Sequence, residues 1–414
     1  MRLRVTAHKT FLKLNPPLIS ASLLLVFLCS ARAQNWEITS APVKFWNSIA
    51  SSADGTKLVA SDGFQLYSST NSGVDWNLTS APINPWAYVA SSAGGDIFVA
   101  AANGFNGGPI YISTNSGVTW ALTGAPTNVP WSAIATSADG TKLAGVGFYD
   151  TIYVSTNSGA TWLTNGAPKP GAGGWECIAS STDGTKLVAL ASDPSSGVTG
   201  SIYTSTNLGT TWTQSGAPKE FWWSVASSAD GVKLVAAAGS GLSPSAVGPI
   251  YTSTNSGSTW TLTTAPNAAW TCVASSADGT RLAAVVYNGL IYTSSDSGAT
   301  WLPATAPNTN WFFVASSADG GKLAAVSGGY TASGLIFSNL NIVPPRLTIT
   351  PSNESVIISW PIPSINFAPQ QTSDLGSTNW TDLLLPLELD LTNLQNRAVI
   401  SSLASNTVYR LRAP

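Results

Sequence analysis

Two glutamates, Glu176 and Glu220, stand apart from the repeated pattern that fills most of this 414-residue chain. Two carboxyl groups about 6.5–9.5 Å apart across a sugar are sufficient for inverting glycoside hydrolysis. Both glutamates follow the end of a repeat, in neighbouring repeats, so we expect them on loops of one face, where they could converge. Solvated loop acids are the commoner arrangement, and a fold alone never implies chemistry. We therefore predict no catalytic residue and keep this pair as the candidates for a hydrolase.

Other catalytic and metal-binding groups are scarce. The single histidine, His8, lies in a predicted signal segment, and a Ser-His-Asp triad or a Cys-His zinc site needs histidine. We expect no cofactor and no metal site. Cys177 and Cys272 occupy equivalent positions in repeats that have another repeat between them. That separation should exceed the reach of a disulfide, so both are predicted to be buried free thiols.

Aromatic side chains are the other group suited to binding. Their flat faces pack against neutral sugar rings or apolar peptides, and concave mouths are common ligand sites. Trp223 is unusual because only its repeat doubles the tryptophan, close to Glu220. The competing interpretation, which we favour for tryptophans present in every repeat, is packing between structural units. The predicted ligand-binding residues are Trp223, Trp175, Trp222, Tyr149, Tyr287 and Tyr330.

An internal repeat positions all of these residues. The stretch Ile250–Trp260, IYTSTNSGSTW, has five near copies, and an unpaired ending of the same kind, NWEITSAP, precedes the first of them. Each repeat continues with an Ala-Pro pair, a second tryptophan and an Asp-Gly or Gly-Gly turn. We call each copy of this stretch a box, and the tryptophans that end the boxes are Trp36, Trp76, Trp120, Trp162, Trp212, Trp260 and Trp301. The second tryptophans are Trp46, Trp86, Trp131, Trp175, Trp222, Trp270 and Trp311.

Each repeat is typical of four short strands. Asp-Gly between two apolar runs, as at Asp54-Gly55, is the strongest short signal for a β-hairpin. Proline in the Ala-Pro pairs and glycine in the boxes mark the other turns. A four-stranded unit of about 40–45 residues has the period of a propeller blade.

The incomplete copies at the two ends complete each other. Seven sets of first, second and third strands follow one another, but only six fourth strands come directly after a third strand. We predict that Trp36–Thr39 supplies the seventh, beside Leu335–Ser338. The predicted fold is all-β: a seven-bladed β-propeller over residues 34–343, closed by an N-terminal strand and followed by a small β-sandwich domain.

The box S-x-[DN]-x-G-x-T-W, as in Ser155–Trp162, resembles the Asp-box of bacterial neuraminidase repeat (BNR) proteins, a superfamily of sialidase-like β-propellers. The resemblance implies a turn between the third and fourth strands, on the face away from an active site. Asparagine replaces the usual aspartate in five boxes, and only Asp296 keeps it. Sialidases need three arginines, whereas Arg281, at a repeated lysine position, is the propeller's single one. Sialidase activity is therefore not expected.

Residues 346–414 lack the repeat and show short alternating strands after the Pro344-Pro345 linker. They resemble the fibronectin-III-like or immunoglobulin-like sandwiches that bacteria append to exported proteins. We expect this tail to act as a spacer or docking module.

The first 33 residues are typical of a secretory signal peptide. Basic residues precede a short apolar run over 18–29, and Ala31-Arg32-Ala33 is a cleavage site of the A-x-A type. The run is too short to span a bilayer. We therefore expect cleavage near Ala33 and secretion to the periplasm or cell exterior, as a monomer without membrane insertion.

Charge narrows the choice of partner. The chain carries a net charge of −2. The predicted signal contains basic but no acidic residues, so its removal makes the net charge more negative. Without a basic cluster there is no electrostatic basis for nucleic-acid binding. We predict an exported, non-catalytic recognition or scaffold propeller that binds a neutral glycan or a protein on the face carrying its variable loops. The alternative is a glycoside hydrolase that uses paired loop carboxylates.

Overall fold

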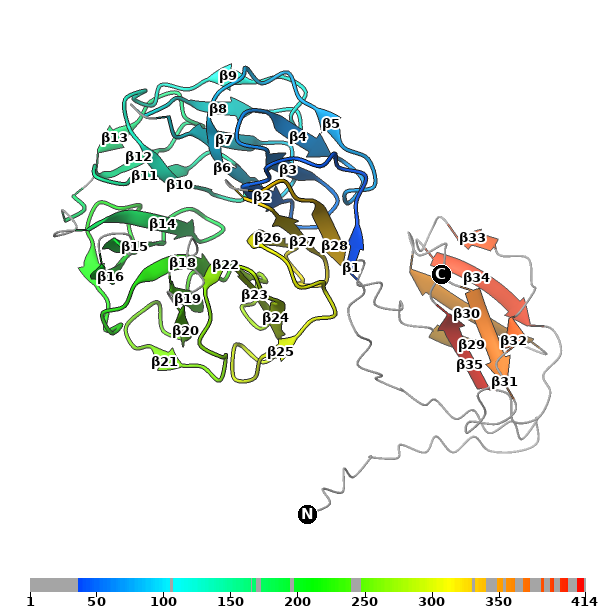
Figure 1. The fold of residues 1–414 in the computed structure, drawn as a ribbon. Coiled ribbons are helices and arrows are strands. Elements are labelled where there is room, and N and C mark those ends of the chain that lie inside the picture. Colours follow the sequence, from blue (N-terminus) through cyan, green and yellow to red (C-terminus); the bar gives the residue numbers. More distant parts are fainter. Residues whose placement is uncertain are drawn as a thin grey trace, which may run out of the picture. The chain divides into compact units, whose positions relative to one another are not determined.

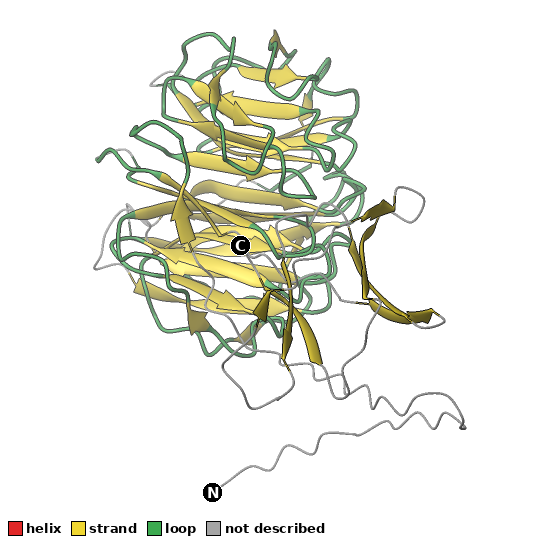
Figure 2. Ribbon diagram, turned by 90° about the vertical axis from the view of Figure 1, so that its right-hand side faces the viewer, coloured by secondary structure: helices red, strands yellow, loops and turns green. Residues whose placement is uncertain are grey.

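The computed structural model describes residues 36–104, 107–164, 166–168, 173–193, 197–239, 247–329 and 332–339, together with the strands of the C-terminal part. Every regular element in these residues is a β-strand, which confirms the all-β class (Figure 2). Among them there is no helix long and apolar enough to cross a membrane. The strands divide into two compact units, β1–β28 and β29–β35.

The first unit consists of seven four-stranded antiparallel sheets, the blades, arranged in a ring (Figure 1). The first strand of each blade lies nearest the axis: β2 (Ser48–Ser51), β6 (Trp86–Ser91), β10 (Trp131–Thr136), β14 (Gly174–Ser180), β18 (Trp222–Ser227), β22 (Trp270–Ser275) and β26 (Trp311–Ser316). The second strands are β3 (Leu58–Ser61), β7 (Phe98–Ala102), β11 (Leu143–Gly147), β15 (Leu187–Asp193), β19 (Leu234–Gly239), β23 (Leu282–Val286) and β27 (Leu323–Ser327).

The outer half of each blade contains a third strand and a short fourth strand. The third strands are β4 (Leu66–Ser69), β8 (Ile110–Ser113), β12 (Ile152–Ser155), β16 (Val198–Ser205), β20 (Val247–Ser253), β24 (Ile291–Ser294) and β28 (Ile336–Asn339). The fourth strands are β5 (Asn77–Leu78), β9 (Ala121–Leu122), β13 (Leu163–Thr164), β17 (Thr213–Gln214), β21 (Thr261–Leu262), β25 (Leu302–Pro303) and β1 (Trp36–Ile38). We number the blades one to seven from β2.

The order of the strands creates two different faces. Neighbouring strands are antiparallel and consecutive in sequence, so the turns after the first and third strands lie on one face, the turn face. The loops after the second strands and the connectors between blades lie on the opposite face, the loop face.

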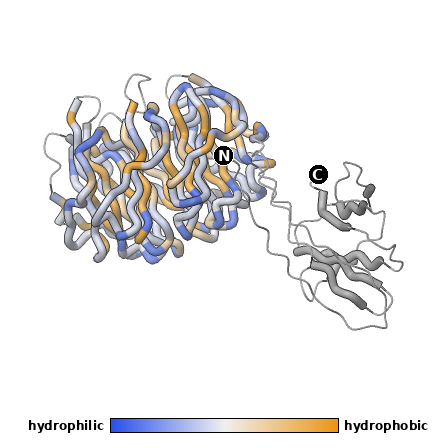
Figure 3. The backbone as a smooth tube through the Cα atoms, turned by 90° about the horizontal axis from the view of Figure 1, so that it is seen from below, coloured by the Kyte–Doolittle hydropathy of each residue, from blue (hydrophilic) through white to orange (hydrophobic). Residues whose placement is uncertain are grey.

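The hydrophobic core lies between the blades. Second strands are buried on both sides, which explains runs such as Phe98–Ala102 with no polar residue. The second tryptophans of all seven repeats are 0% exposed and wedge against the neighbouring blade. Figure 3 shows hydrophobic segments through the body of the propeller and hydrophilic ones towards the strand ends.

The N-terminal strand closes the ring, as predicted. β1 pairs antiparallel with β28, with Glu37 opposite Ser338 (Figure 1). A closed circle of hydrogen bonds lies on the turn face. One backbone N–H group in each blade donates to a backbone carbonyl in the next blade, over 2.7–2.8 Å. The residues in this circle are Ala53, Ala93, Ala138, Thr182, Ala229, Ala277 and Ala318, which donates back to Ala53.

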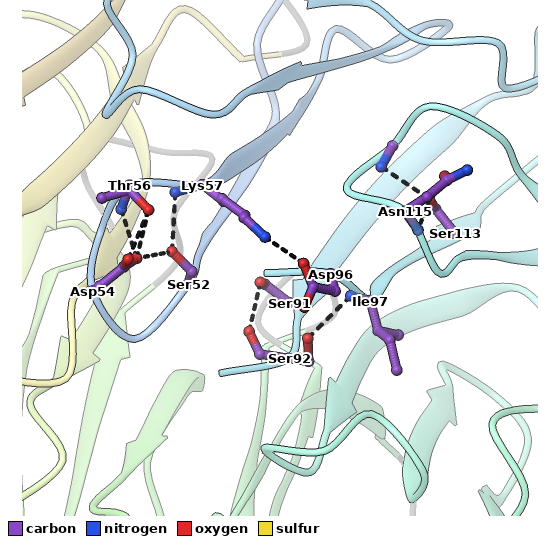
Figure 4. Close-up of polar contacts among 11 residues, drawn as sticks. Ser52, Asp54, Thr56, Lys57, Ser91, Ser92, Asp96, Ile97, Ser113 and Asn115 are labelled. Atoms are coloured by element: carbon purple, nitrogen blue, oxygen red, sulfur yellow. Dashed lines mark hydrogen bonds and ion pairs between the residues drawn. The ribbon is translucent and has the colours of Figure 1, made fainter. Parts of the chain in front are cut away.

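The hairpin turns on the turn face are held by their aspartates. In blade one, Asp54 accepts hydrogen bonds from the Ser52 hydroxyl (2.6 Å) and the Thr56 amide (2.9 Å) (Figure 4). Such turns fix both strands of the hairpin. Lys57 then pairs with Asp96 of blade two, so the same segment also links neighbouring blades.

The box turns follow one hydrogen-bond pattern. In blade two, the Asn115 side-chain oxygen accepts from the Thr119 amide (2.8 Å), and the Ser113 hydroxyl accepts from the Gly117 amide (2.9 Å). Trp120 donates from Nε1 to the Gly117 carbonyl (3.1 Å), as Trp162 and Trp260 do in their boxes, whereas Nε1 of Trp76, Trp212 and Trp301 has no hydrogen-bond partner among the described residues. Asparagine therefore serves the turn without a charge, and these residues have a structural role.

The second unit contains seven strands in two antiparallel sheets. One sheet has the order β29-β30-β34-β33 and the other β32-β31-β35. The strands are β29 (Thr348–Ser352), β30 (Ser355–Pro361), β31 (Ala368–Thr372), β32 (Thr381–Asp382), β33 (Glu388–Asp390), β34 (Gln395–Ile400) and β35 (Val408–Arg412).

The turn aspartates predict acid sensitivity. Hydrogen bonds from a serine hydroxyl and a backbone amide lower the pKa of Asp139, Asp183 and Asp278 to about 2. An unfolded aspartate titrates near 3.9, so these groups stabilise the fold above that pH and lose their contribution as pH falls towards 2. We expect the melting temperature to fall steeply between pH 4 and pH 2. The triple Asp→Asn variant should show a flatter profile in the same scan, and an unchanged slope would contradict this account.

Candidate functional site

The loop face carries an exposed apolar cluster at blades one and two. Its members, Val43, Phe45, Phe64 and Ile83, are 50–74% exposed. We call these four residues the apolar patch. They belong to the connector into blade one, the β3–β4 loop and the connector into blade two. Groups of exposed apolar side chains on linked segments are candidates for interaction sites.

Hydrogen bonds and an ion pair hold the three segments of the patch together. The Asn84 amide donates to the Phe64 carbonyl (3.3 Å), which joins the second connector to the loop. Lys44 pairs with the buried Asp62 carboxylate (3.4 Å), which joins the first connector to the same loop. Asp62 also accepts from the Phe64 amide (2.9 Å). The patch is therefore built on an ordered frame.

The patch is specific to these two blades. The residue after the Ala-Pro pair is Val43 in the first connector and Ile83 in the second, but polar in the other five. Those five residues are Thr127, Lys169, Lys219, Asn267 and Asn308. Aligning this one position across the repeats would have revealed the difference, whereas our sequence reasoning looked only at aromatic residues and acids.

Two of the predicted ligand-binding tryptophans are core residues. Trp175 and Trp222 are 0% exposed, so neither indole offers a surface to a ligand, and their burial agrees with the packing interpretation favoured for tryptophans present in every repeat. Trp222 packs edge-on against Tyr251, with ring centroids 5.6 Å apart. The tryptophan at this position is equally buried in every blade, so none of these rings faces solvent at the centre of the ring of blades.

Glu176 and Trp223 occupy the same position in neighbouring blades. Each directly follows the buried tryptophan, at a β-bulge in the innermost strand, and each is partly buried. Glu176 therefore lies within β14 and not on a loop as predicted. In blades one, three and six the equivalent residues Asn47, Ser132 and Thr271 donate from their side chains to the carbonyl of the next blade's tryptophan, which is a structural role.

Glu220 lies on the connector before β18. Its backbone carbonyl accepts from the Gly200 amide (2.9 Å), and its carboxylate accepts from the Tyr251 hydroxyl (3.5 Å). Tyr251 belongs to the third strand of blade five, whereas Glu176 lies on the innermost strand of blade four. The carboxylate of Glu220 is thus directed towards an outer strand, and its neighbouring groups give it a structural role.

The predicted tyrosines differ in exposure. Tyr149 is 72% exposed in the β11–β12 turn and packs edge-on against Phe148 at 4.4 Å. Tyr287 is partly buried, with its amide donating to the Ala269 carbonyl (2.9 Å). Tyr330 lies outside the described residues. Tyr149 is therefore the member of this group with a free ring face.

The two cysteines have neither a disulfide nor an activated thiol. Cys177 and Cys272 are unpaired as predicted, although only Cys272 is fully buried and Cys177 is partly buried, and desolvation raises the pKa of Cys177 to about 12 and that of Cys272 to about 11. Thiols with such a pKa remain protonated at neutral pH and behave as small hydrophobic groups. In the described part of the chain, no three His, Cys, Asp or Glu side chains gather into a possible metal site.

Neither a known protein family nor a curated protein sequence matches this chain. Solved structures do resemble it. The GH74 xyloglucanase from Xanthomonas campestris has a TM-score of 0.53 at 13% identity, over 86% of this chain and 60% of that one. YCF48 from Cyanidioschyzon merolae has a TM-score of 0.54 at 15% identity, over 74% of this chain and 98% of that one. A structure of YCF48 bound to D1 peptide has a TM-score of 0.53 at 14% identity, over 77% of this chain and 99% of that one.

These similarities concern the fold. The chain spans only about 60% of the length of the xyloglucanase, and the identities are too low to carry an activity across. The protein is a seven-bladed β-propeller, and its neighbours in structure include both an enzyme that acts on a polysaccharide and a peptide-binding protein.

Proposed function

We propose that this protein is an exported, non-catalytic recognition propeller that binds a protein partner through the apolar patch on its loop face. The apolar patch itself carries the proposal, because three separate segments converge there and leave four large apolar side chains in solvent. Export rests on the signal peptide predicted in residues 1–33.

A protein partner suits this surface better than a sugar. Two of the four side chains, Val43 and Ile83, are aliphatic, and the nearby charges of Lys44 and Asp62 already neutralise each other. Protein interfaces have an apolar centre with few charges and a polar rim. The peptide-bound YCF48 structure supports the idea that a propeller of this kind can hold a polypeptide.

A neutral glycan is the second candidate, because the exposed Tyr149 ring next to Phe148 offers the flat surface that sugars prefer. The hydrolase alternative has less support. Glu176 lies inside a strand, and Glu220 is directed to Tyr251.

The variant that tests the proposal takes its substitutions from other blades of the propeller. Val43→Asn with Ile83→Asn installs a residue that blades six and seven carry at this position, so the fold should remain intact. Peptides selected from a phage-displayed library on the wild-type protein should be apolar. They should bind the double variant at least about tenfold more weakly than wild type, because the two substitutions remove apolar side chains that anchor the interface. Leu302→Asn, a comparable exposed position on β25, should bind like wild type.

Two outcomes would overturn the protein-partner proposal. One is equal binding of the selected peptides to wild type and to the double variant. The other is a failure to select any peptide, together with binding to a polysaccharide panel that Tyr149→Ala abolishes. The second result would establish the glycan candidate in its place.

A further inference from the structure

A depression of about 310 Å³ lies between blades three and four, at the outer end of their box turns. Blade three contributes Thr156, Thr161, Leu163 and Thr164, and blade four contributes Leu208 and Thr210. This place is on the side of the propeller opposite the loop face, so it is independent of the apolar patch and of the function proposed above.

Among the described residues, no side chain after the fourth strand of blade three occupies the depression. At three other blade junctions, a serine or threonine after the fourth strand donates to a carbonyl of the next box turn. These bonds run from Ser40 to Val74, from Ser80 to Val118 and from Thr264 to Ala299, over 2.6–2.9 Å. The equivalent residue here is Gly166, and glycine also stands at this position in the two neighbouring junctions, as Gly124 and Gly216. A Cβ added at Gly166 would lie 3.1 Å from the Thr210 carbonyl oxygen, so a side chain would fill the gap.

Leu208 is the local departure from the repeat. It holds the left-handed position of its box turn, with φ of 54°, where the other five boxes have serine. The conformation itself is shared by all six boxes, so the departure lies in the side chain and not in the backbone. The substitution places a large apolar side chain directly over the depression.

The chemistry of the lining defines the ligand class. No charged side chain lines the depression. Leu163, Leu208 and Val154 supply apolar surface. The Thr161 oxygen accepts from Asn157 (2.9 Å), so its own hydroxyl hydrogen remains to donate. The Thr210 hydroxyl donates to the Asn207 carbonyl (2.8 Å), so its oxygen remains to accept.

We infer that this depression is a binding site for a neutral sugar ring. A pyranose has apolar C–H faces that suit the leucines, and hydroxyl groups that both donate and accept. A volume of 310 Å³ is at the lower end for ligand pockets and accommodates a single ring. For a ligand of this size, a dissociation constant on the order of 1 mM is expected.

Methyl NMR tests the inference. The full chain is labelled at leucine and valine methyls. Methyl α-D-glucopyranoside, methyl α-D-galactopyranoside or N-acetylglucosamine is then added up to about 100 mM, well above the expected dissociation constant. We expect at least one sugar to shift the methyl signals of Leu163, Leu208 and Val154 saturably. Gly166→Ser installs the serine that two other junctions have, as Ser40 and Ser80, and should weaken binding about tenfold or more, because it occupies the ligand's volume.

A matched pair of variants separates binding from folding. Leu163→Ser removes a lining residue, whereas Leu122→Ser makes the same change at a similarly exposed position of β9, outside the depression. The first should lose the sugar response and the second should keep it, with both melting cooperatively. If no sugar shifts these methyls, or if the shifts persist undiminished in both Gly166→Ser and Leu163→Ser, the site does not exist.

Discussion

Replacing Trp222 with alanine is expected to destabilise the propeller by about 3–5 kcal/mol, the usual cost of removing a buried tryptophan. The side chain is 0% exposed, and it packs against Tyr251 of its own blade and Trp260 of its box, with centroids 5.6 Å and 6.4 Å away. In a propeller of this size the loss should lower the melting temperature by about 10 °C.

The neighbouring residue provides the control. Trp223→Ala removes a side chain that is only partly buried, so its effect on melting should be clearly smaller. Peptide binding at the apolar patch should survive in the folded fraction of the Trp222 variant. A variant that melts like wild type but no longer binds would show that the Trp222 ring contacts a ligand after all.

Removing Trp36–Thr39 is expected to have an effect of similar or larger size. This segment covers the edge of β28, and Trp36 packs against Trp311 with centroids 6.1 Å apart. The Thr39 amide also donates to the Ile336 carbonyl (2.9 Å). Its loss would leave the backbone groups of β28 unpaired and the last blade open to fraying. We expect the melting temperature to fall by about 10 °C or more, whereas truncation after Pro345 should change it little.

The architecture was predictable because its signals are local and repeated. The Asp-Gly hairpins, the box turns and the Ala-Pro connectors each specify a turn over a few residues, and seven repetitions fix the number of blades. Even the pairing of β1 with β28 could be predicted, since an incomplete first repeat and an incomplete last repeat leave no other way to complete a blade.

The candidate sites were harder to predict because they depend on details that the repeat pattern does not contain. The bulge after Trp175 keeps Glu176 inside β14, so an acid that follows a repeat in sequence is part of a strand in space. Burial of the repeated tryptophans, by contrast, agrees with the packing role that their presence in every repeat favoured.

Convergence of distant segments was the other missing information. Phe64 and Ile83 are neighbours only because Asn84 bonds to the β3–β4 loop. Likewise, the depression between blades three and four arises where Gly166 and Leu208, each unremarkable in sequence, meet across a junction. These sites are marked by departures from the repeat at single positions, and they become recognisable when the blades are compared.

Hydrogen exchange at the turn-face circle of backbone bonds tests ring closure most directly. The Ala318 amide donates to Ala53 across the junction between the last and first blades, over 2.7 Å. A closed ring predicts that Ala318 is protected as strongly as Ala277 at an internal junction, and that removing Trp36–Thr39 lowers the protection of Ala318 first. Rapid exchange at Ala318 in the intact protein, or equal protection with and without the N-terminal strand, would contradict a propeller closed by that strand.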